Sequence, residues 1–335
     1  MQLPSVQVTR AIVQRYARIR ARLTEELGAR PLVLPNGEFF PDTFRQDDER
    51  SAAALTERML EHAGMLDIPV RTRVVRLGEA QNSSCSSGAC GVPQVSSQGL
   101  QRVTDEGDAW LIQLPEAELR HPVALTTNLA RSLAFIFLVE TKKEDEVLEP
   151  PVDVTADFTA VALGFGTLML QGSYIYAKSC GGPQIASVTK VNVSELAVAV
   201  ALFAAVGEHR VAGALKHLDV TQRSVLEEAD RLVRANKKLI SKLRTDPDWV
   251  ARGTFSLEEP SGLLSSLWRG LREKKSVPAN KQLLEMDLDE VEALMIDMPP
   301  SSSVPSRPSR PMAAPDPERE ELKELVSEAF RGAGA

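Results

Sequence analysis

Cysteine is scarce, and the three cysteines cannot form a disulfide framework. The chain of 335 residues contains Cys85, Cys90 and Cys180, an odd number. Its first residues also lack the run of roughly 7 to 15 apolar residues typical of a secretory signal. We therefore expect reduced thiols in a cytoplasmic protein. His62 and His121 do not complete a standard zinc spacing with Cys85 and Cys90, which favours a polar loop there.

Excess basic charge, long apolar runs and phosphate-binding motifs are absent as well. The formal net charge of -7 argues against nucleic-acid binding, which usually requires a basic face. The longest apolar runs, residues 160–170 and 196–206, are shorter than the roughly 20 residues that cross a bilayer. We expect no membrane span. No G-x-x-x-x-G-K-[ST] motif occurs, and LGFGTLMLQGS lacks the G-x-G-x-x-G spacing, so nucleotide binding is not predicted.

Apolar residues at three- and four-residue intervals predict a mainly helical α+β protein. Period-two alternation in IPVRTRVVRL and AWLIQLP predicts two strands of a small sheet. Ser194 is the expected N-cap of the core helix SELAVAVALFAAVGE. The other expected helices span residues 8–27, 47–62, 122–141, 154–172, 208–218 and 221–244.

A change of composition after Asp246 predicts where the folded domain ends. Scattered Gly and Pro residues follow, and the Ser/Pro/Arg tract cannot form a core. The predicted organisation is an α+β domain at 1–245, an irregular connection at 246–282, an acidic amphipathic helix at 283–298, a linker at 299–317 and a C-terminal helix at 318–335.

The two predicted C-terminal helices are candidates for binding a partner protein. Isolated helices of this length are marginal in water, so each should dock on this chain or on another protein. The first contains six acidic residues and no basic one between Glu285 and Met298. The apolar stripes that would make these contacts are Leu284, Leu288, Val291 and Met295 in one helix, and Leu322, Leu325 and Phe330 in the other.

Several separate stretches carry a resemblance to a known family. In order they read LPNGEFFPDTF, LTTNLARSLAFIFL, DVTADFTAVALGFG and VNVSELAVAVALFA. Together they resemble a poorly characterised bacterial family of predicted zinc-peptidase-like proteins, over roughly residues 30–245. The resemblance implies a zincin-like core, with a helix that reads approximately A-H-E-L-A-H and a later helix that carries an acidic residue and a G-F-G turn.

The metal-binding residues of that family are missing here. In an H-E-x-x-H helix two imidazoles grip zinc, and the glutamate between them is the general base. The equivalent positions hold Arg131, Ser132 and Phe135. Neither arginine nor phenylalanine offers a lone pair to a metal, and serine lacks the carboxylate of the base. We therefore expect no catalytic residue, no metal and no cofactor.

Two acidic residues remain where the resemblance implies the family's acidic side chains. Asp153 and Asp157 cannot hold zinc without the histidines. Arg131, on a helix predicted to be buried, needs a carboxylate partner. The sequence therefore predicts an ion pair between Arg131 and Asp157, in place of the metal.

These observations predict a non-catalytic relative of the family, a pseudoenzyme that acts as a binding protein or scaffold for an unidentified partner. One alternative is a hydrolase with a non-standard metal site at Asp153, Asp157 and His121. A second is a thiol enzyme that uses Cys180, which has Lys178 and two glycines beside it. A third is a regulator in a cytoplasmic signalling or cell-polarity system.

Overall fold

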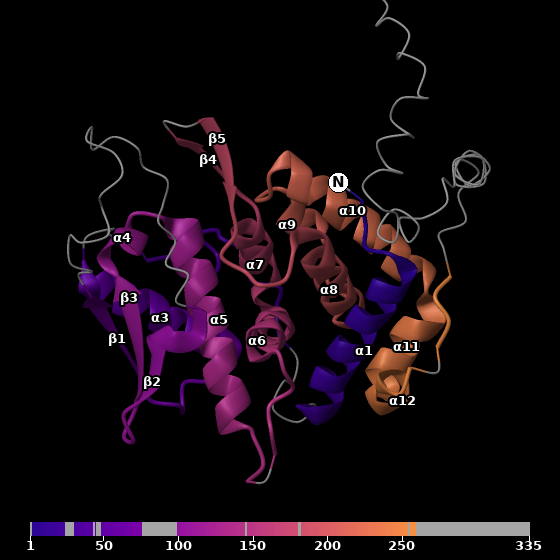
Figure 1. The fold of residues 1–335 in the computed structure, drawn as a ribbon, viewed down its shortest axis with the longest axis horizontal. Coiled ribbons are helices and arrows are strands. Elements are labelled where there is room, and N and C mark those ends of the chain that lie inside the picture. Colours follow the sequence, from indigo (N-terminus) through magenta and orange to yellow (C-terminus); the bar gives the residue numbers. More distant parts are fainter. Residues whose placement is uncertain are drawn as a thin grey trace, which may run out of the picture. The chain divides into compact units, whose positions relative to one another are not determined.

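The chain forms a mainly helical structure with two small sheets (Figure 1). The structure is a computed structural model that describes residues 2–23, 30–42, 44, 48–75, 99–144, 146–179, 182–253 and 255–258. The predicted mainly helical α+β class is confirmed at this level. The predicted segments at 283–298, 299–317 and 318–335, with their apolar stripes, lie outside the described residues, as do Cys85, Cys90 and Cys180.

The expected helices and the two expected strands occur in the expected order, together with short helices and strands that were not predicted, and the helix expected at 208–218 spans only Ala212–Leu215. The helices are α1 (Val6–Arg22), α3 (Glu49–Ala63), α4 (Glu116–Leu119), α5 (Pro122–Glu140), α6 (Val152–Ala160), α7 (Gly166–Ser173), α8 (Val193–Val206), α9 (Ala212–Leu215), α10 (Val220–Ala235), α11 (Lys237–Thr245) and α12 (Pro247–Ala251), with a 3-10 turn η2 (Gly99–Arg102) and a π-helical turn η3 (Val161–Phe165). The strands are β1 (Val70–Val75), β2 (Val103–Asp105), β3 (Trp110–Pro115), β4 (Ile175–Ser179) and β5 (Gly182–Ala186).

The larger sheet has three strands in the order β1-β3-β2. The two strands that the alternation predicts, β1 and β3, pair in parallel, with Val70 opposite Trp110. The short β2 pairs antiparallel with β3, which places it at the other edge. Figure 1 shows this sheet beside α3 and α5, and β4 and β5 as a separate antiparallel hairpin.

Helix α8 is the centre of the helical core. Its sequence VSELAVAVALFAAV is apolar on nearly all sides, and the residues from Leu196 to Val206 are all buried. Small alanine side chains let α7, α10 and α1 pack closely around it. Asn192, not Ser194, is its N-cap, because the Asn192 side chain accepts a hydrogen bond from the N–H of Glu195. Ser194 instead donates its hydroxyl to the Asn192 side chain.

Two helical stretches are long and apolar enough to cross a membrane by length and composition alone. They are Pro122–Glu140 and Val152–Ser173. Neither stretch is an unbroken apolar run, because Arg131 interrupts the first and Asp157 interrupts the second. Their most apolar windows are 72% and 83% buried within the protein, and the core helices of soluble proteins pass the same test. The absence of a membrane span therefore stays a prediction.

A glycine breaks the second of these stretches. Gly164, within η3, has φ of 100°, and its carbonyl accepts a hydrogen bond from the N–H of Val33. A Cβ at Gly164 would lie 2.2 Å from the carbonyl oxygen of Pro31. Glycine is therefore required twice at this point, once for the backbone angle and once for the contact with the segment before α3. The helix predicted over 154–172 did not include this break.

The folded domain extends past residue 245, where an irregular connection was expected. Helix α12 packs against α1 and α11, and Phe255 is buried in the same core. The Asn236 side chain bonds the backbone of Glu258, which fastens the chain after α12. Asn236 also divides the single helix expected at 221–244 into α10 and α11. The boundary was placed too early because the apolar residues after 245 are few and widely spaced.

Replacing Gly164 by alanine should destabilise the protein more than the same change at Gly107. Gly107 also has a positive φ, 86°, but a methyl group added there would have no neighbouring atom within 4 Å, so Gly107→Ala should cost only about 1–2 kcal/mol of backbone strain. Gly164→Ala should cost about 1–3 kcal/mol more, from the clash with Pro31. Urea unfolding followed by circular dichroism measures both. Equal losses of unfolding free energy in the two variants would show that the segment before α3 makes no close steric contact with η3.

Candidate functional site

The three positions where the resemblance implies a metal motif lie on α5, and all contact protein atoms. Arg131 is 2% and Ser132 is 1% exposed. The Ser132 hydroxyl donates to the carbonyl of Asn128, one turn earlier on the helix. Phe135 is half-buried, and its ring lies edge-on to Trp110 of β3 with centroids 6.5 Å apart. Ser132 and Phe135 therefore have packing roles within the helix and against the sheet.

Arg131 joins α5 to two other parts of the core. Its Nε lies 2.5 Å from Asp157 Oδ1, and one terminal nitrogen lies 3.0 Å from Asp153 Oδ1, both on α6. The other terminal nitrogen donates to the carbonyl of Val188, in the segment before α8, at 3.1 Å. The ion pair between Arg131 and Asp157 that the sequence predicts is thus present in the structure. Each of the three guanidinium nitrogens of Arg131 therefore donates a hydrogen bond to another part of the protein.

Asp157 is the more deeply buried partner, with no exposed surface. Its Oδ2 accepts hydrogen bonds from the N–H groups of Lys190 and Val191, at 2.7 and 3.0 Å. Burial raises the pKa of this carboxyl, and Arg131 and the two backbone amides oppose that rise. Both carboxylate oxygens of Asp157 are therefore engaged by protein donors.

The alternative metal site is not assembled. Among the residues that the structure describes, no group of three or more His, Cys, Asp or Glu side chains is placed to hold a metal ion. Asp153, Asp157 and His121 are all described and do not form such a group. His121 is instead the residue before the first turn of α5. The ligand set expected for the alternative hydrolase is therefore not brought together.

Comparisons with protein-family models, with curated proteins and with solved structures find no significant match to this chain. The resemblance to zinc-peptidase-like proteins stays a prediction from the sequence.

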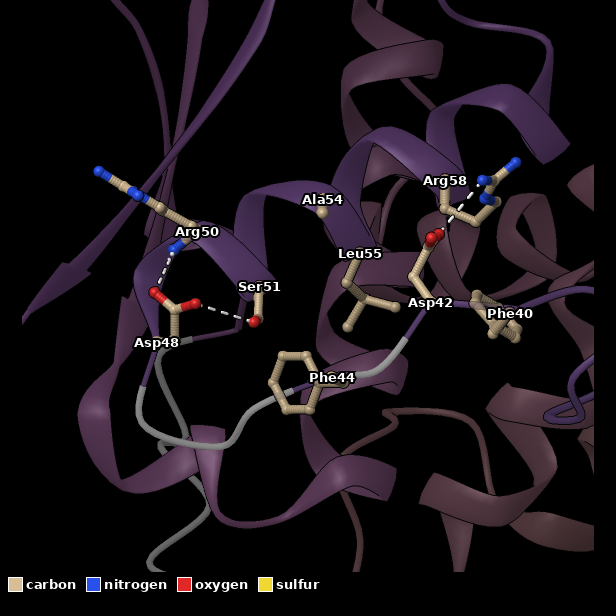
Figure 2. Close-up of a pocket in the computed structure, with 9 residues that line it drawn as sticks. All are labelled: Phe40, Asp42, Phe44, Asp48, Arg50, Ser51, Ala54, Leu55 and Arg58. Carbon is tan, nitrogen blue, oxygen red and sulfur yellow. Dashed lines mark hydrogen bonds and ion pairs between the residues drawn. The ribbon is translucent and has the colours of Figure 1, made fainter.

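A second feature, an apolar pocket, lies between α3 and the segment before it. It has a volume of about 240 Å³, and its apolar wall is formed by Phe40, Phe44, Ala54 and Leu55. Figure 2 shows Leu55 extending from α3 toward the ring of Phe44. The pocket is open to solvent on one side, so a side chain from outside can enter it.

A neighbouring pocket of about 330 Å³ shares Phe40, Phe44 and Leu55 with the first. It continues over Leu125 at the start of α5 and Leu168 of α7. We call the two together the twin pocket, defined by the shared residues Phe40, Phe44 and Leu55. An apolar ligand with two adjacent groups could fill both halves.

Asp42, Asp48 and Arg58, three of the charged residues around the first half, have polar partners among the described residues. Arg58 lies 3.2 Å from Asp42 and 2.5 Å from Glu61, so its charge is balanced twice. Asp48 caps α3, and hydrogen bonds from the N–H of Arg50 and the hydroxyl of Ser51 lower its pKa. The pocket therefore offers mainly apolar surface, since its acidic groups already have partners.

The sequence around the aromatic residues of the twin pocket indicates a different role for them. Phe40 and Phe44 lie in a segment rich in Pro and Gly, which is typical of an ordered loop anchored on the core by its aromatic residues. Both are incompletely buried and line the opening as well. The sequence gives no indication that Leu55 lines a pocket, because a leucine on an amphipathic helix is normally a core residue.

Replacing Arg131 should show how far the fold depends on its ion pairs. Arg131→Met leaves the Asp157 carboxylate buried without a cation and should cost about 3–5 kcal/mol of unfolding free energy. Arg131→Met combined with Asp157→Asn should recover part of this loss, because no unpaired charge remains. Thermal and urea unfolding measure the difference.

The matched control is Arg71→Met, which removes the ion pair between Arg71 and Asp108. These side chains are 60% and 66% exposed, so the loss should be below about 1 kcal/mol. A double variant no more stable than Arg131→Met alone would contradict the proposed dependence on charge pairing.

Proposed function

We propose that the protein is a non-catalytic, cytoplasmic binding or scaffold protein built on a zinc-peptidase-like fold. The observation that carries this proposal is the ion cluster of Arg131, Asp153 and Asp157. A guanidinium occupies the inner face of α5, where a metallopeptidase helix would present its first histidine. It satisfies the acidic side chains that a metal would otherwise share, so the architecture is kept without the chemistry.

The twin pocket supports the binding part of the proposal. Apolar pockets rimmed by polar groups are where partner proteins commonly insert an anchoring side chain. Here Phe40, Phe44 and Leu55 offer such a wall, and the ion pairs of Arg58 lie at its polar edge. We infer that a partner inserts one or two large apolar side chains there.

Three other interpretations of the sequence stay as proposals. The predicted helices at 283–298 and 318–335 would give the protein further means of binding a partner, and a regulator in a signalling or cell-polarity system is a narrower form of the same function. The thiol enzyme using Cys180 is the remaining catalytic alternative, and it requires a general base that the sequence does not identify.

Metal analysis tests the non-catalytic part directly. Protein purified without chelators should contain zinc well below one ion per chain, by inductively coupled plasma mass spectrometry. Arg131→Met, which removes the competing cation, should leave this value unchanged because no histidine is present at positions 131 and 135. Stoichiometric zinc that is lost in Asp157→Ala would refute the proposal.

Changing Leu55 tests the twin pocket. A photo-cross-linking amino acid at Ala54, in the pocket wall, should capture a discrete partner from cells that express the full chain. Leu55→Arg should abolish that cross-link, because it places a charge in the apolar wall. Leu66→Arg is the matched control, since Leu66 is 61% exposed and does not line the pocket. Retention of the same cross-link in Leu55→Arg would show that the partner binds elsewhere.

A further inference from the structure

The outer face of α11 is an unusually basic surface in an acidic protein. Between Arg231 and Thr245 the sequence RLVRANKKLISKLRT contains six basic residues and no acidic one, although the whole chain has a net charge of -7. Leu239, Ile240 and Leu243 face the core, so the other residues of α11 form its outer face. The basic residues are therefore concentrated on one exposed side.

Acidic residues of the same chain neutralise part of this positive charge. Arg234 pairs with Asp230, and Arg244 pairs with Glu208, at 2.8 and 2.6 Å. The charge that is left belongs to Arg231 of α10 and to Lys237, Lys238 and Lys242 of α11. The three lysines are exposed and make no ion pair with any described residue. The ammonium of Lys242 lies 5.6 Å from the centre of the Trp249 ring, a half-buried aromatic group on α12.

These lysines are poorly placed for the stability of their own helix. Lys237 and Lys238 are in the first turn of α11, where the helix dipole disfavours positive charge. Asn236, at the N-cap position, does not cap the helix, because its side chain bonds Leu232 and Glu258. Lys238 and Lys242 are four residues apart on one face, a repulsive spacing. Local stability therefore does not explain them, and a binding role does.

The extent of the surface favours one class of partner. Glu227 and Glu228 precede it and Asp246 and Asp248 follow it, which limits it to roughly two helical turns. A nucleic acid or an anionic membrane would meet these carboxylates as well. Because the apolar side of α11 is buried, α11 also has no face that can enter a bilayer. A short acidic helix matches both the charge and the length.

We propose that the outer face of α11 is a docking site for an acidic amphipathic helix of a partner protein. Lys237, Lys238 and Lys242 bind its carboxylates, and Trp249 provides an apolar contact at one edge. This surface is independent of the twin pocket, from which it differs in the chemistry of its ligand. The two sites give the protein two different recognition modes.

The test uses the full chain and a synthetic helical peptide of about 14 residues, roughly four turns, with glutamates on one face and leucines on the other. Fluorescence anisotropy of the labelled peptide should show binding that weakens as salt is raised. A peptide with glutamine in place of each glutamate should bind at least about tenfold more weakly, because the charge complementarity is lost.

The decisive variant is Lys237→Glu/Lys238→Glu/Lys242→Glu, which should weaken peptide binding at least about tenfold. The control Lys142→Glu/Lys143→Glu/Lys216→Glu makes the same change in net charge at exposed lysines elsewhere and should keep binding within about twofold. A second variant, Lys237→Gln/Lys238→Gln/Lys242→Gln, is compared with the unchanged protein by thermal unfolding. An unchanged melting temperature together with weaker peptide binding shows that binding is lost without loss of folding. Leu55→Arg should leave peptide binding intact, which separates this site from the twin pocket.

Equal binding by the α11 variant and its control would overturn the proposal. The proposal would also be overturned if the protein bound phosphatidylserine vesicles or a single-stranded RNA oligonucleotide more tightly than the peptide, and if the α11 variant lost that binding. Either result would assign the surface to a lipid or a nucleic acid.

Discussion

The burial of one carboxylate governs the arrangement of the core. Asp157 has no exposed surface, and a bare charge at such depth would be prohibitively costly. The protein surrounds it with the guanidinium of Arg131 from α5 and two amides from the segment before α8. Three parts of the chain that are distant in sequence are thereby held at one point. The packing of α5, α6 and α8 must be compatible with this cluster, because no other group replaces its donors.

Much of the fold could be predicted because it follows from local patterns. The spacing of apolar residues predicted α1, α3, α5, α8 and the two paired strands, and the need of Arg131 for a partner predicted its ion pair. The rest depended on contacts between distant residues. The division at Asn236 requires its bonds to Glu258, and the break at Gly164 requires the nearby Pro31. The local sequence around Asn236 and around Gly164 contains no pattern that predicts either contact.

Prediction of the candidate site had the same limits. The absence of histidine and glutamate at positions 131, 132 and 135 is visible residue by residue, and coordination depends on the chemical type of each side chain. The twin pocket is visible only in three dimensions, because Phe40 and Phe44 come from one segment, Leu55 from a helix and Leu168 from another. The lysines of α11 could be counted in the sequence, but their lack of acidic partners emerges only when Arg234 and Arg244 are seen to be paired.

The contact between α1 and α12 has a consequence for the synthesis of the protein. Helix α1 packs against α8 and α12, and Arg10 donates a hydrogen bond to the carbonyl of Phe255. A nascent chain therefore carries the apolar side of α1 for about 170 residues of translation before α8 is made, and for more than two hundred before α12 is made. During that interval α1 lacks these native contacts. Completion of the core is a late, long-range closure rather than a stepwise growth from the first helix.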